Sequence, residues 1–371
     1  MPLTDRIQAF LEKPIMAGVF FLGGVIWDTV TLTRIDRLRD NLILLFYLLV
    51  LGGLIVAAAR AELGVSRCAE AGLEGELPWP ERIRPYYQRA IQFLLGGQFS
   101  AYAIYYFKSA SLTSTWVFIV LLVGLLVANE FFHHRFGSMR LLIGLYSLVS
   151  LSFFTFFLPV VTKVMNTWIF LLGVGLSVAL TLTVVGLIYR PRSESGFRER
   201  LHLGLPGLTL VALVVGFYFL NLIPPVPLSL RFGGVYHEVS REGDTFHLAF
   251  ESEAWYHFWQ RSDDPYRGAG PVYCFTAVFA PVDLHTTIYH RWEFRAVDAK
   301  GLGKYSTTDR VGFSVAGGRD DGYRGYSVKQ SVLPGDWRVF VETAEGHILG
   351  RVSFRVEPPS PEPPYLKTIA Y

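Results

Sequence analysis

The residues Pro224-Pro225-Val226-Pro227 separate two kinds of sequence in this 371-residue chain. Before them lie seven long apolar stretches, and after them come short alternating segments rich in Trp and Gly. Proline lacks a backbone donor and fixes its own φ, so this run interrupts any helix or inner strand. We therefore expect a helical domain that ends near residue 224, a Pro-rich junction over residues 225–230, and a β-rich domain from residue 231.

The composition favours a membrane protein, because 51% of the residues are hydrophobic and the mean hydropathy is +0.34. Residues 1–229 carry 18 Lys and Arg against 13 Asp and Glu, whereas residues 230–371 carry 16 against 18. A net negative C-terminal part is not expected to bind nucleic acid, since phosphate contacts need clustered Lys and Arg. Cys68 and Cys274 fall in different halves, so we expect no disulfide between them.

The apolar stretches are long enough to cross a membrane, since a hydrocarbon core about 30 Å thick needs about 20 apolar residues per helix. We predict seven spans over residues 14–32, 41–59, 88–107, 112–132, 139–161, 166–189 and 205–224, preceded by a short interfacial helix over residues 1–13. With the N-terminus in the cytoplasm, 13 Lys and Arg fall in inside loops and 5 in outside loops. This asymmetry predicts a multi-pass inner-membrane protein with an extracytoplasmic C-terminal domain.

The apolar period changes from helix to strand after the junction. In Thr287–Phe294, for example, Ile288, His290 and Trp292 alternate with polar residues, and similar alternation recurs in later segments. Together with the turn signals between them, these segments predict about seven strands and a β-sandwich of immunoglobulin-like size over residues 231–357. The firmest local prediction is a hairpin from Trp337 to Val356 that turns at Glu345-Gly346. Residues 358–371 are predicted to form a Pro-rich tail.

The C-terminal domain contains several short motifs, namely His290-Arg291-Trp292, Gly317-Gly318-Arg319-Asp320, Gly322–Ser327 and Pro334–Val339, followed by Gly346 and Phe354. In these motifs it resembles the bacterial family known as domain of unknown function 2914. The helical half is similar to longer members of that family in Trp27-Asp28, Thr33–Arg37, Gln92-Phe93, Gly96-Gly97, Phe107–Ser111 and Asn129–Phe131. The resemblance implies a multi-spanning bacterial envelope protein whose C-terminal domain has no assigned activity, and it carries over no catalytic residue.

Two groups of polar residues lie at the ends of the predicted spans, where charged side chains are often functional. The first, which we call the membrane polar group, lies at the predicted outer ends of the first four spans and comprises Asp28, Arg34, Asp36, Arg37, Tyr105, Lys108 and Ser109. These side chains form either an anion-binding patch or ion pairs that fix helix ends. The second contains Glu130 and His134, which are four residues apart and could both bind one metal ion on the same face of a helix. Two ligands alone do not make a metal site. We expect no metal and no cofactor.

A second candidate site lies in the β-rich domain and is called here the aromatic–turn surface. It comprises Trp255, Trp259, Arg319, Asp320, Tyr323 and Arg324. Aromatic side chains can stack on sugar rings or rest at a membrane interface, but they also pack at the edges of β-domains. His290 shares a strand face with Ile288 and Trp292, which favours a hydrogen-bonded core histidine over a catalytic base.

No nucleophile elbow, Walker loop, dinucleotide fingerprint or cysteine redox pair is present in the sequence. The leading hypothesis is therefore a non-enzymatic membrane protein whose extracytoplasmic domain binds an envelope protein or a glycan. The alternative is a membrane enzyme or transporter that acts on a lipid-linked glycan or a phospholipid through the membrane polar group. Membrane lipids are expected partners under both hypotheses.

Overall fold

The structure, a computed structural model, describes residues 26, 37–70, 84–109, 120, 123–124, 138–190, 197–223, 227–251, 261–296, 303–319, 321–358 and 365–371. Contacts divide the chain into two compact units whose main boundary lies between Leu222 and Ile223, and Lys163–Met165 groups with the second unit. This boundary lies next to the Pro-rich junction at which the sequence changes its period.

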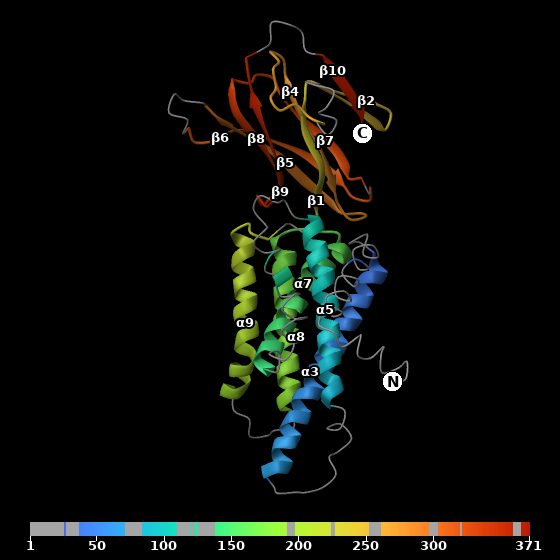
Figure 1. The fold of residues 1–371 in the computed structure, drawn as a ribbon, viewed down its shortest axis with the longest axis vertical. Coiled ribbons are helices and arrows are strands. Elements are labelled where there is room, and N and C mark those ends of the chain that lie inside the picture. Colours follow the sequence, from blue (N-terminus) through green and yellow to red (C-terminus); the bar gives the residue numbers. More distant parts are fainter. Residues whose placement is uncertain are drawn as a thin grey trace, which may run out of the picture. The chain divides into compact units, whose positions relative to one another are not determined.

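The N-terminal unit is helical in its described part (Figure 1). Its five helices are α3 (Leu38–Glu70), α5 (Arg84–Ser109), α7 (Met139–Thr162), α8 (Thr167–Tyr189) and α9 (Phe197–Phe219). Within the described residues, four helices are long and apolar enough to cross a membrane, namely α7, α8, α9 and the part of α3 over Leu38–Glu62. They overlap four of the seven predicted spans, which confirms the helical, strongly apolar character of this half.

The remaining predicted spans have different outcomes. Helix α5 contains the predicted span 88–107 but is not one of the four most apolar helices, because Gln92, Gln98 and several tyrosines lower its hydropathy. The predicted spans 14–32 and 112–132 lie outside the described residues except for four isolated positions, and the predicted helix over residues 1–13 lies wholly outside them. The number of spans therefore stays a prediction.

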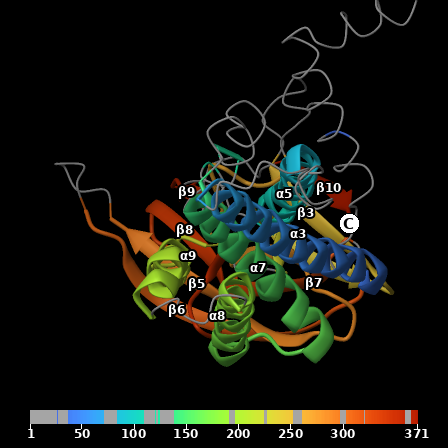
Figure 2. The ribbon, with the colours of Figure 1, turned by 90° about the horizontal axis from the view of Figure 1, so that it is seen from below.

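Helix α7 is the central helix of the described bundle and contacts α3, α8 and α9 (Figure 2). Its polar groups face its neighbours: Ser150 Oγ lies 2.6 Å from Ser177 Oγ, and Ser147 Oγ lies 3.1 Å from Thr181 Oγ1. Between α3 and α5, Gln98 Nε2 donates to the carbonyl oxygen of Leu44 at 2.9 Å. Such neutral hydrogen bonds and small residues are what helix contacts use where water is absent.

The C-terminal unit is β-rich. Its described residues form ten strands: β1 (Ser229–Tyr236), β2 (Glu238–Glu242), β3 (Thr245–Glu251), β4 (Val272–Phe279), β5 (His285–Arg295), β6 (Ser306–Ala316), β7 (Tyr323–Lys329), β8 (Gly335–Thr343), β9 (Ile348–Val356) and β10 (Leu366–Ala370). They make three sheets with the orders β1-β4-β7, β10-β3-β2 and β6-β5-β8-β9. We call these the middle sheet, the end sheet and the four-stranded sheet; all named pairs are antiparallel.

The middle sheet packs on both of the others. On one side, Cys274 of β4 joins Trp292, Trp337 and Phe354 of the four-stranded sheet in one buried cluster. On the other side, Phe275 packs with aromatic and aliphatic residues of the end sheet. Successive residues of β4 point to opposite faces, and each face is covered by another sheet. Strand β4 is therefore buried along almost its whole length. The β-rich character of this domain is confirmed, whereas the immunoglobulin-like sandwich stays a prediction. The described residues form ten strands instead of about seven, and the end sheet adds a third layer.

Local predictions in this unit agree with the structure. Ile288, His290 and Trp292 are buried on one side of β5, as their alternation predicts. The hairpin of β8 and β9 turns at Gly346, whose φ of +88° is a conformation that glycine adopts without strain.

The C-terminal residues depart from the predicted tail. Strand β10 pairs with β3, and the ring of Tyr371 stacks on Phe232 with centroids 4.7 Å apart. Residues 366–370 are thus an edge strand of the end sheet, because β3 offers unpaired backbone groups that a short apolar segment can satisfy. Residues 359–364 lie outside the described residues.

Candidate binding surface

The four-stranded sheet has one face against the middle sheet and one face turned away from it, which we call the arginine face. Because the side-chain period of a strand is two, residues that flank the buried Trp292 on β5 belong to this face. The register places Arg291 between Arg310 of β6 and Phe340 of β8, and Phe340 opposite Arg351 of β9. Three arginines and one aromatic ring therefore lie in one row across the four strands.

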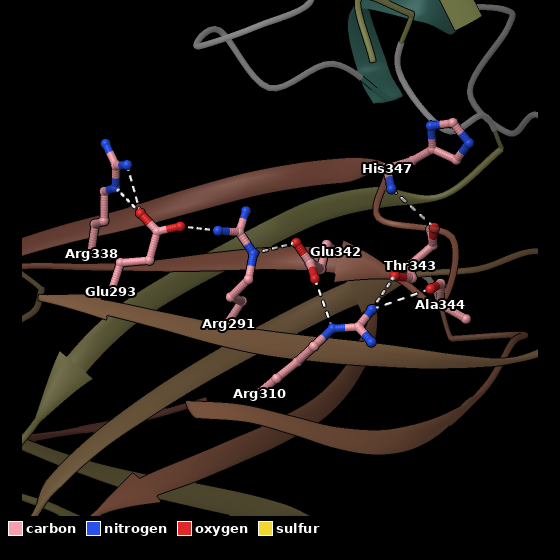
Figure 3. A network of polar contacts seen from close by, with 8 residues as sticks. All are labelled: Arg291, Glu293, Arg310, Arg338, Glu342, Thr343, Ala344 and His347. Atoms are coloured by element: carbon pink, nitrogen blue, oxygen red, sulfur yellow. Dashed lines mark hydrogen bonds and ion pairs between the residues drawn. The ribbon is translucent and has the colours of Figure 1, made fainter. Parts of the chain in front are cut away.

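Five charged side chains alternate in sign across this face (Figure 3). Arg338 Nε and Glu293 Oε2 are 2.6 Å apart, and Glu293 also pairs with Arg291. Arg291 Nε then donates to Glu342 Oε2 at 2.8 Å, and Arg310 Nε donates to Glu342 Oε1 at 2.9 Å. Each glutamate thus lies between two guanidinium groups, and we call the whole series the charge ladder.

The two glutamates are the buried members of the charge ladder, and the arginines are its open members. The Glu293 and Glu342 side chains are 8% and 5% exposed, whereas Arg291 and Arg310 are 24% and 39% exposed. A buried carboxylate needs this pairing, because an unpaired charge away from water is costly. The sheet therefore presents guanidinium edges to solvent above carboxylates that are already neutralised.

Three guanidinium groups of the charge ladder lie over aromatic rings. Arg310 lies over the Tyr289 ring at 3.9 Å from its centroid, Arg291 over Phe340 at 4.6 Å, and Arg338 over Tyr305 at 3.7 Å. A planar cation over a ring face gains an electrostatic attraction and loses rotamer freedom. The arginines are consequently pre-positioned instead of being free to sample solvent.

A second ion-pair group extends the arginine face beside the charge ladder. Asp336 of β8 accepts from Arg295 Nη2 at 2.5 Å and from Arg355 Nε at 3.0 Å. The hydrogen bond from Arg295 is the main cause that holds the pKa of Asp336 below its usual range, with Arg355 adding to it. Here too one carboxylate lies between two arginines.

The arginine face carries an excess of positive charge. Among the described strand residues it contains six arginines and three acids: Arg291, Arg295, Arg310, Arg338, Arg351 and Arg355 against Glu293, Asp336 and Glu342. The difference is +3, although residues 230–371 as a whole carry −2. The sequence reasoning missed this segregation, because the sum over the domain hides it. The alternation around Arg291 and Glu293 was the available signal.

Among the described residues, the cluster most like an acid–base site joins His237, between β1 and β2, to Glu251 at the end of β3 and to Asp263. His237 Nδ1 is 2.8 Å from Asp263 Oδ2, and its Nε2 is 3.0 Å from Glu251 Oε1. Burial raises the pKa of both carboxyls, and both also accept backbone N–H groups, Asp263 from Glu251 and Glu251 from Arg267. These bonds hold the end of β3 to the residues that follow it. We therefore assign the cluster a structural role in the fold.

His290 is the core histidine that its strand position predicts. Its Nε2 lies 2.9 Å from Thr276 Oγ1 and its Nδ1 lies 2.8 Å from Ser327 Oγ, and the ring is fully buried. Burial lowers its pKa to about 3. The ring is therefore neutral at physiological pH and has no solvent access for proton transfer.

The structure describes only part of the membrane polar group. Asp28, Arg34 and Asp36 lie outside the described residues, as do the side chains of Lys108 and Ser109. Arg37 is exposed, and Tyr105 is fully buried in α5 with its ring 5.3 Å from that of Phe156. The anion-binding patch and the alternative enzyme or transporter hypothesis stay predictions.

The aromatic–turn surface is divided by the structure. Arg319 Nη2 lies 3.4 Å from Asp244 Oδ1, and Arg324 Nη1 donates to the Asp244 carbonyl oxygen at 2.6 Å, so these two arginines meet at one turn. Tyr323 instead packs against the core shared by the middle and four-stranded sheets, because neighbouring strand residues point to opposite faces. The other three members, Trp255, Trp259 and Asp320, lie outside the described residues.

The part of the chain that the structure describes contains no group of three His, Cys, Asp or Glu side chains placed to hold a metal ion. Glu130 and His134 lie outside that part, so their shared site remains an unfavoured prediction.

Comparisons with known proteins identify the region that carries the arginine face. Residues 285–356 match the family model described as "Protein of unknown function (DUF2914)", as the sequence resemblance predicted for this domain. The match begins with β5 and ends with β9. No curated protein matches the chain.

The solved structure of Pseudomonas fluorescens alkylpurine DNA glycosylase AlkC bound to DNA containing an abasic site analog aligns with 84% of this chain and 96% of that chain. The identity is 10% and the TM-score is 0.20. At this score the alignment carries no argument about fold or function.

Proposed function

We propose that this chain is a bacterial inner-membrane protein whose β-rich domain lies outside the cytoplasm and binds an envelope protein or glycan. The single observation that carries the proposal is the arginine face, an ordered and solvent-exposed array of cations with a charge excess of +3. We include in the proposal seven spans and an immunoglobulin-like relation of the two packed sheets. The four strongly apolar helices and the 13 to 5 distribution of Lys and Arg support the membrane placement.

The chemistry of the arginine face favours binding over catalysis. Arginine stays protonated in proteins, so it cannot act as a general base. The carboxylates of the charge ladder, Glu293 and Glu342, are buried and already paired with two arginines each, so they are poorly placed to accept a proton from a ligand. What remains open is a set of N–H donors suited to hold a negatively charged or polar partner.

Site-specific photo-crosslinking in cells tests the binding proposal. A photoreactive amino acid at Ser353, which is exposed on the same side of β9 as Arg351 and Arg355, is expected to form an adduct with an envelope component. The same group at Glu238, which is exposed on β2 of the end sheet, is the matched control. If Ser353 gives no adduct, or only the adduct that Glu238 also gives, this proposal is wrong.

Protease access tests the placement of the domain. In sealed vesicles of known orientation, protease on the extracytoplasmic side is expected to remove residues 231–371. Digestion from the cytoplasmic side would overturn the topology.

A further inference from the structure

We propose that the arginine face binds a linear acidic glycan through its carboxylate groups, with Arg351 and Arg355 of β9 as direct contacts. This inference rests on the proposed binding function and names its ligand class. Three features of the face support this ligand class: its distribution of charge, the way it already holds carboxylates, and the absence of apolar anchors on its described strand residues.

The positive excess is concentrated on β9. On the arginine face, this strand contributes Arg351, Ser353 and Arg355, so it adds two positive charges and no negative charge. Arg355 shares Asp336 with Arg295, whereas Arg351 is exposed and makes no hydrogen bond or ion pair with any described residue. Arg351 therefore continues the row of Arg310, Arg291 and Phe340 without a carboxylate partner of its own.

The array is suited to carboxylates because it holds three of them in the same way. Glu293, Glu342 and Asp336 each lie between two arginines that come from different positions on the sheet. The planar guanidinium presents parallel N–H donors that match the two oxygens of a carboxylate. A ligand carboxylate at Arg351 would extend this arrangement to the edge of the sheet.

The shape of the face suits an extended polymer. The row from Arg310 to Arg351 crosses three strand spacings of about 4.8 Å each, or about 14 Å in total. Guanidinium groups along such a row can meet successive charged groups of one chain. A short, single-charged ligand would use only one end of it.

A water-soluble glycan fits this face better than a bilayer or a protein partner. Among the described strand residues of the arginine face, none is a large apolar side chain exposed to solvent. The rings of Tyr289, Tyr305 and Phe340 lie beneath guanidinium groups. Membrane-surface binding and protein interfaces both use apolar or aromatic anchors that bury on contact, and this face offers charge and hydrogen-bond donors instead.

The test uses the full chain in nanodiscs of uncharged phosphatidylcholine and isothermal titration with oligogalacturonate, a linear polymer of carboxylate-bearing sugars. We expect binding that weakens as salt is added, because exposed charges are screened. Neutral dextran oligomers of the same length are expected not to bind. Vesicles containing phosphatidylglycerol, tested by flotation, are expected to bind much more weakly than the acidic glycan.

Substitutions connect the binding to β9. Arg351→Glu is expected to weaken oligogalacturonate binding about tenfold or more, because one charge-assisted contact is replaced by repulsion. Arg351→Lys should retain most of the affinity. The matched control is Arg241→Glu on the end sheet, an exposed arginine with the same charge change, which is expected to leave the affinity unchanged.

The outcomes separate this inference from the function on which it rests. No oligogalacturonate binding, equal losses from the Arg351→Glu and Arg241→Glu substitutions, or preferential binding to anionic vesicles would each overturn the glycan assignment. If Ser353 still forms a specific adduct in cells under any of these results, the domain binds a different envelope component. If Ser353 forms no specific adduct either, both proposals fail.

Discussion

Polar side chains inside the contact of α7 with α8 are hydroxyl groups that meet in separate pairs, whereas those on the four-stranded sheet are ions joined in a continuous series. The serine and threonine pairs are fully enclosed between helices. The charge ladder has buried carboxylates and arginines that reach solvent. The two units therefore use polarity for different purposes.

The physical reason lies in the cost of burying charge. A hydroxyl pair satisfies its donors and acceptors at short range and lets helices approach closely, which suits a unit that we place in a membrane. Ions are tolerated where water can still solvate part of each pair, as on an exposed sheet face. An open array of cations is suited to bind a partner, and this difference is why we propose ligand binding for the β-rich unit. Four changes test the comparison.

The largest effect is expected from Glu342→Ala. Removal of this carboxylate leaves Arg291 and Arg310 without their shared acceptor, so we expect a loss of roughly 2–4 kcal/mol in the unfolding free energy of the β-rich unit. Urea unfolding in detergent, followed by protease resistance of residues 231–371, measures it. Glu345→Ala in the exposed turn of the same hairpin is the control and should change the value by less than about 0.5 kcal/mol. Equal midpoints for the two variants would show that the charge ladder does not stabilise the unit.

In the helical unit, the corresponding test is Gly207→Ala in α9. An added Cβ would lie 2.2 Å from Ser147 Oγ, so either Ser147 changes rotamer and loses its contact with Thr181 Oγ1, or α7 and α9 separate, at a cost of about 1–3 kcal/mol. Thermal unfolding in detergent measures the change. Gly216→Ala on the same helix meets no heavy atom within 4 Å and should be neutral or stabilising by up to about 1 kcal/mol. A neutral Gly207 variant would contradict the close helix contact.

The pH dependence of the unfolding free energy tests whether His290 is buried in its neutral form in the β-rich unit. His290 has a folded-state pKa of about 3, against about 6.5 in the unfolded chain. The stabilisation that the neutral His290 adds to the unfolding free energy is therefore complete above about pH 6.5. It is lost as the pH falls toward 3, because over this range only the unfolded chain takes up the proton. The slope from this group reaches about 1.4 kcal/mol per pH unit between these values.

His290→Gln isolates this effect. The raised pKa values of Glu251 and Asp263 act with the opposite sign, but they contribute equally to both proteins, so the difference between the two pH profiles reports His290. We expect the variant to lose less stability than the parent between pH 6 and pH 4 when unfolding free energies are measured in urea. Parallel profiles would mean that the histidine is not buried in its neutral form.

The smallest effect is expected from Arg351→Ala. This side chain is exposed and has no partner among the described residues, so the unfolding free energy should change by less than about 0.5 kcal/mol. The same urea assay measures it. A clear loss of stability would show that Arg351 belongs to the folding network and would weaken its assignment as a ligand contact.

The sequence predicted those features that depend on local patterns. The alternation of Ile288, His290 and Trp292 identified the buried side of β5, and Gly346 identified the hairpin turn, since both signals lie within a few residues. The candidate site was predicted less well. The aromatic–turn surface includes both Tyr323 and Arg324, although adjacent residues of a strand point their side chains to opposite faces. The charge ladder joins Arg310 to Glu342 across 32 residues, a relation that no local pattern contains.

By itself, the sequence determined the division of the chain at Pro224–Pro227, the apolar helices before it and the alternating strands after it. These features follow from hydropathy and side-chain period, which act over one helix or one strand. Only the tertiary structure decided that β10 joins the end sheet and that six arginines meet on one face of the four-stranded sheet. Strand pairing and register bring together residues far apart in the chain, and they depend on the packing of the whole domain.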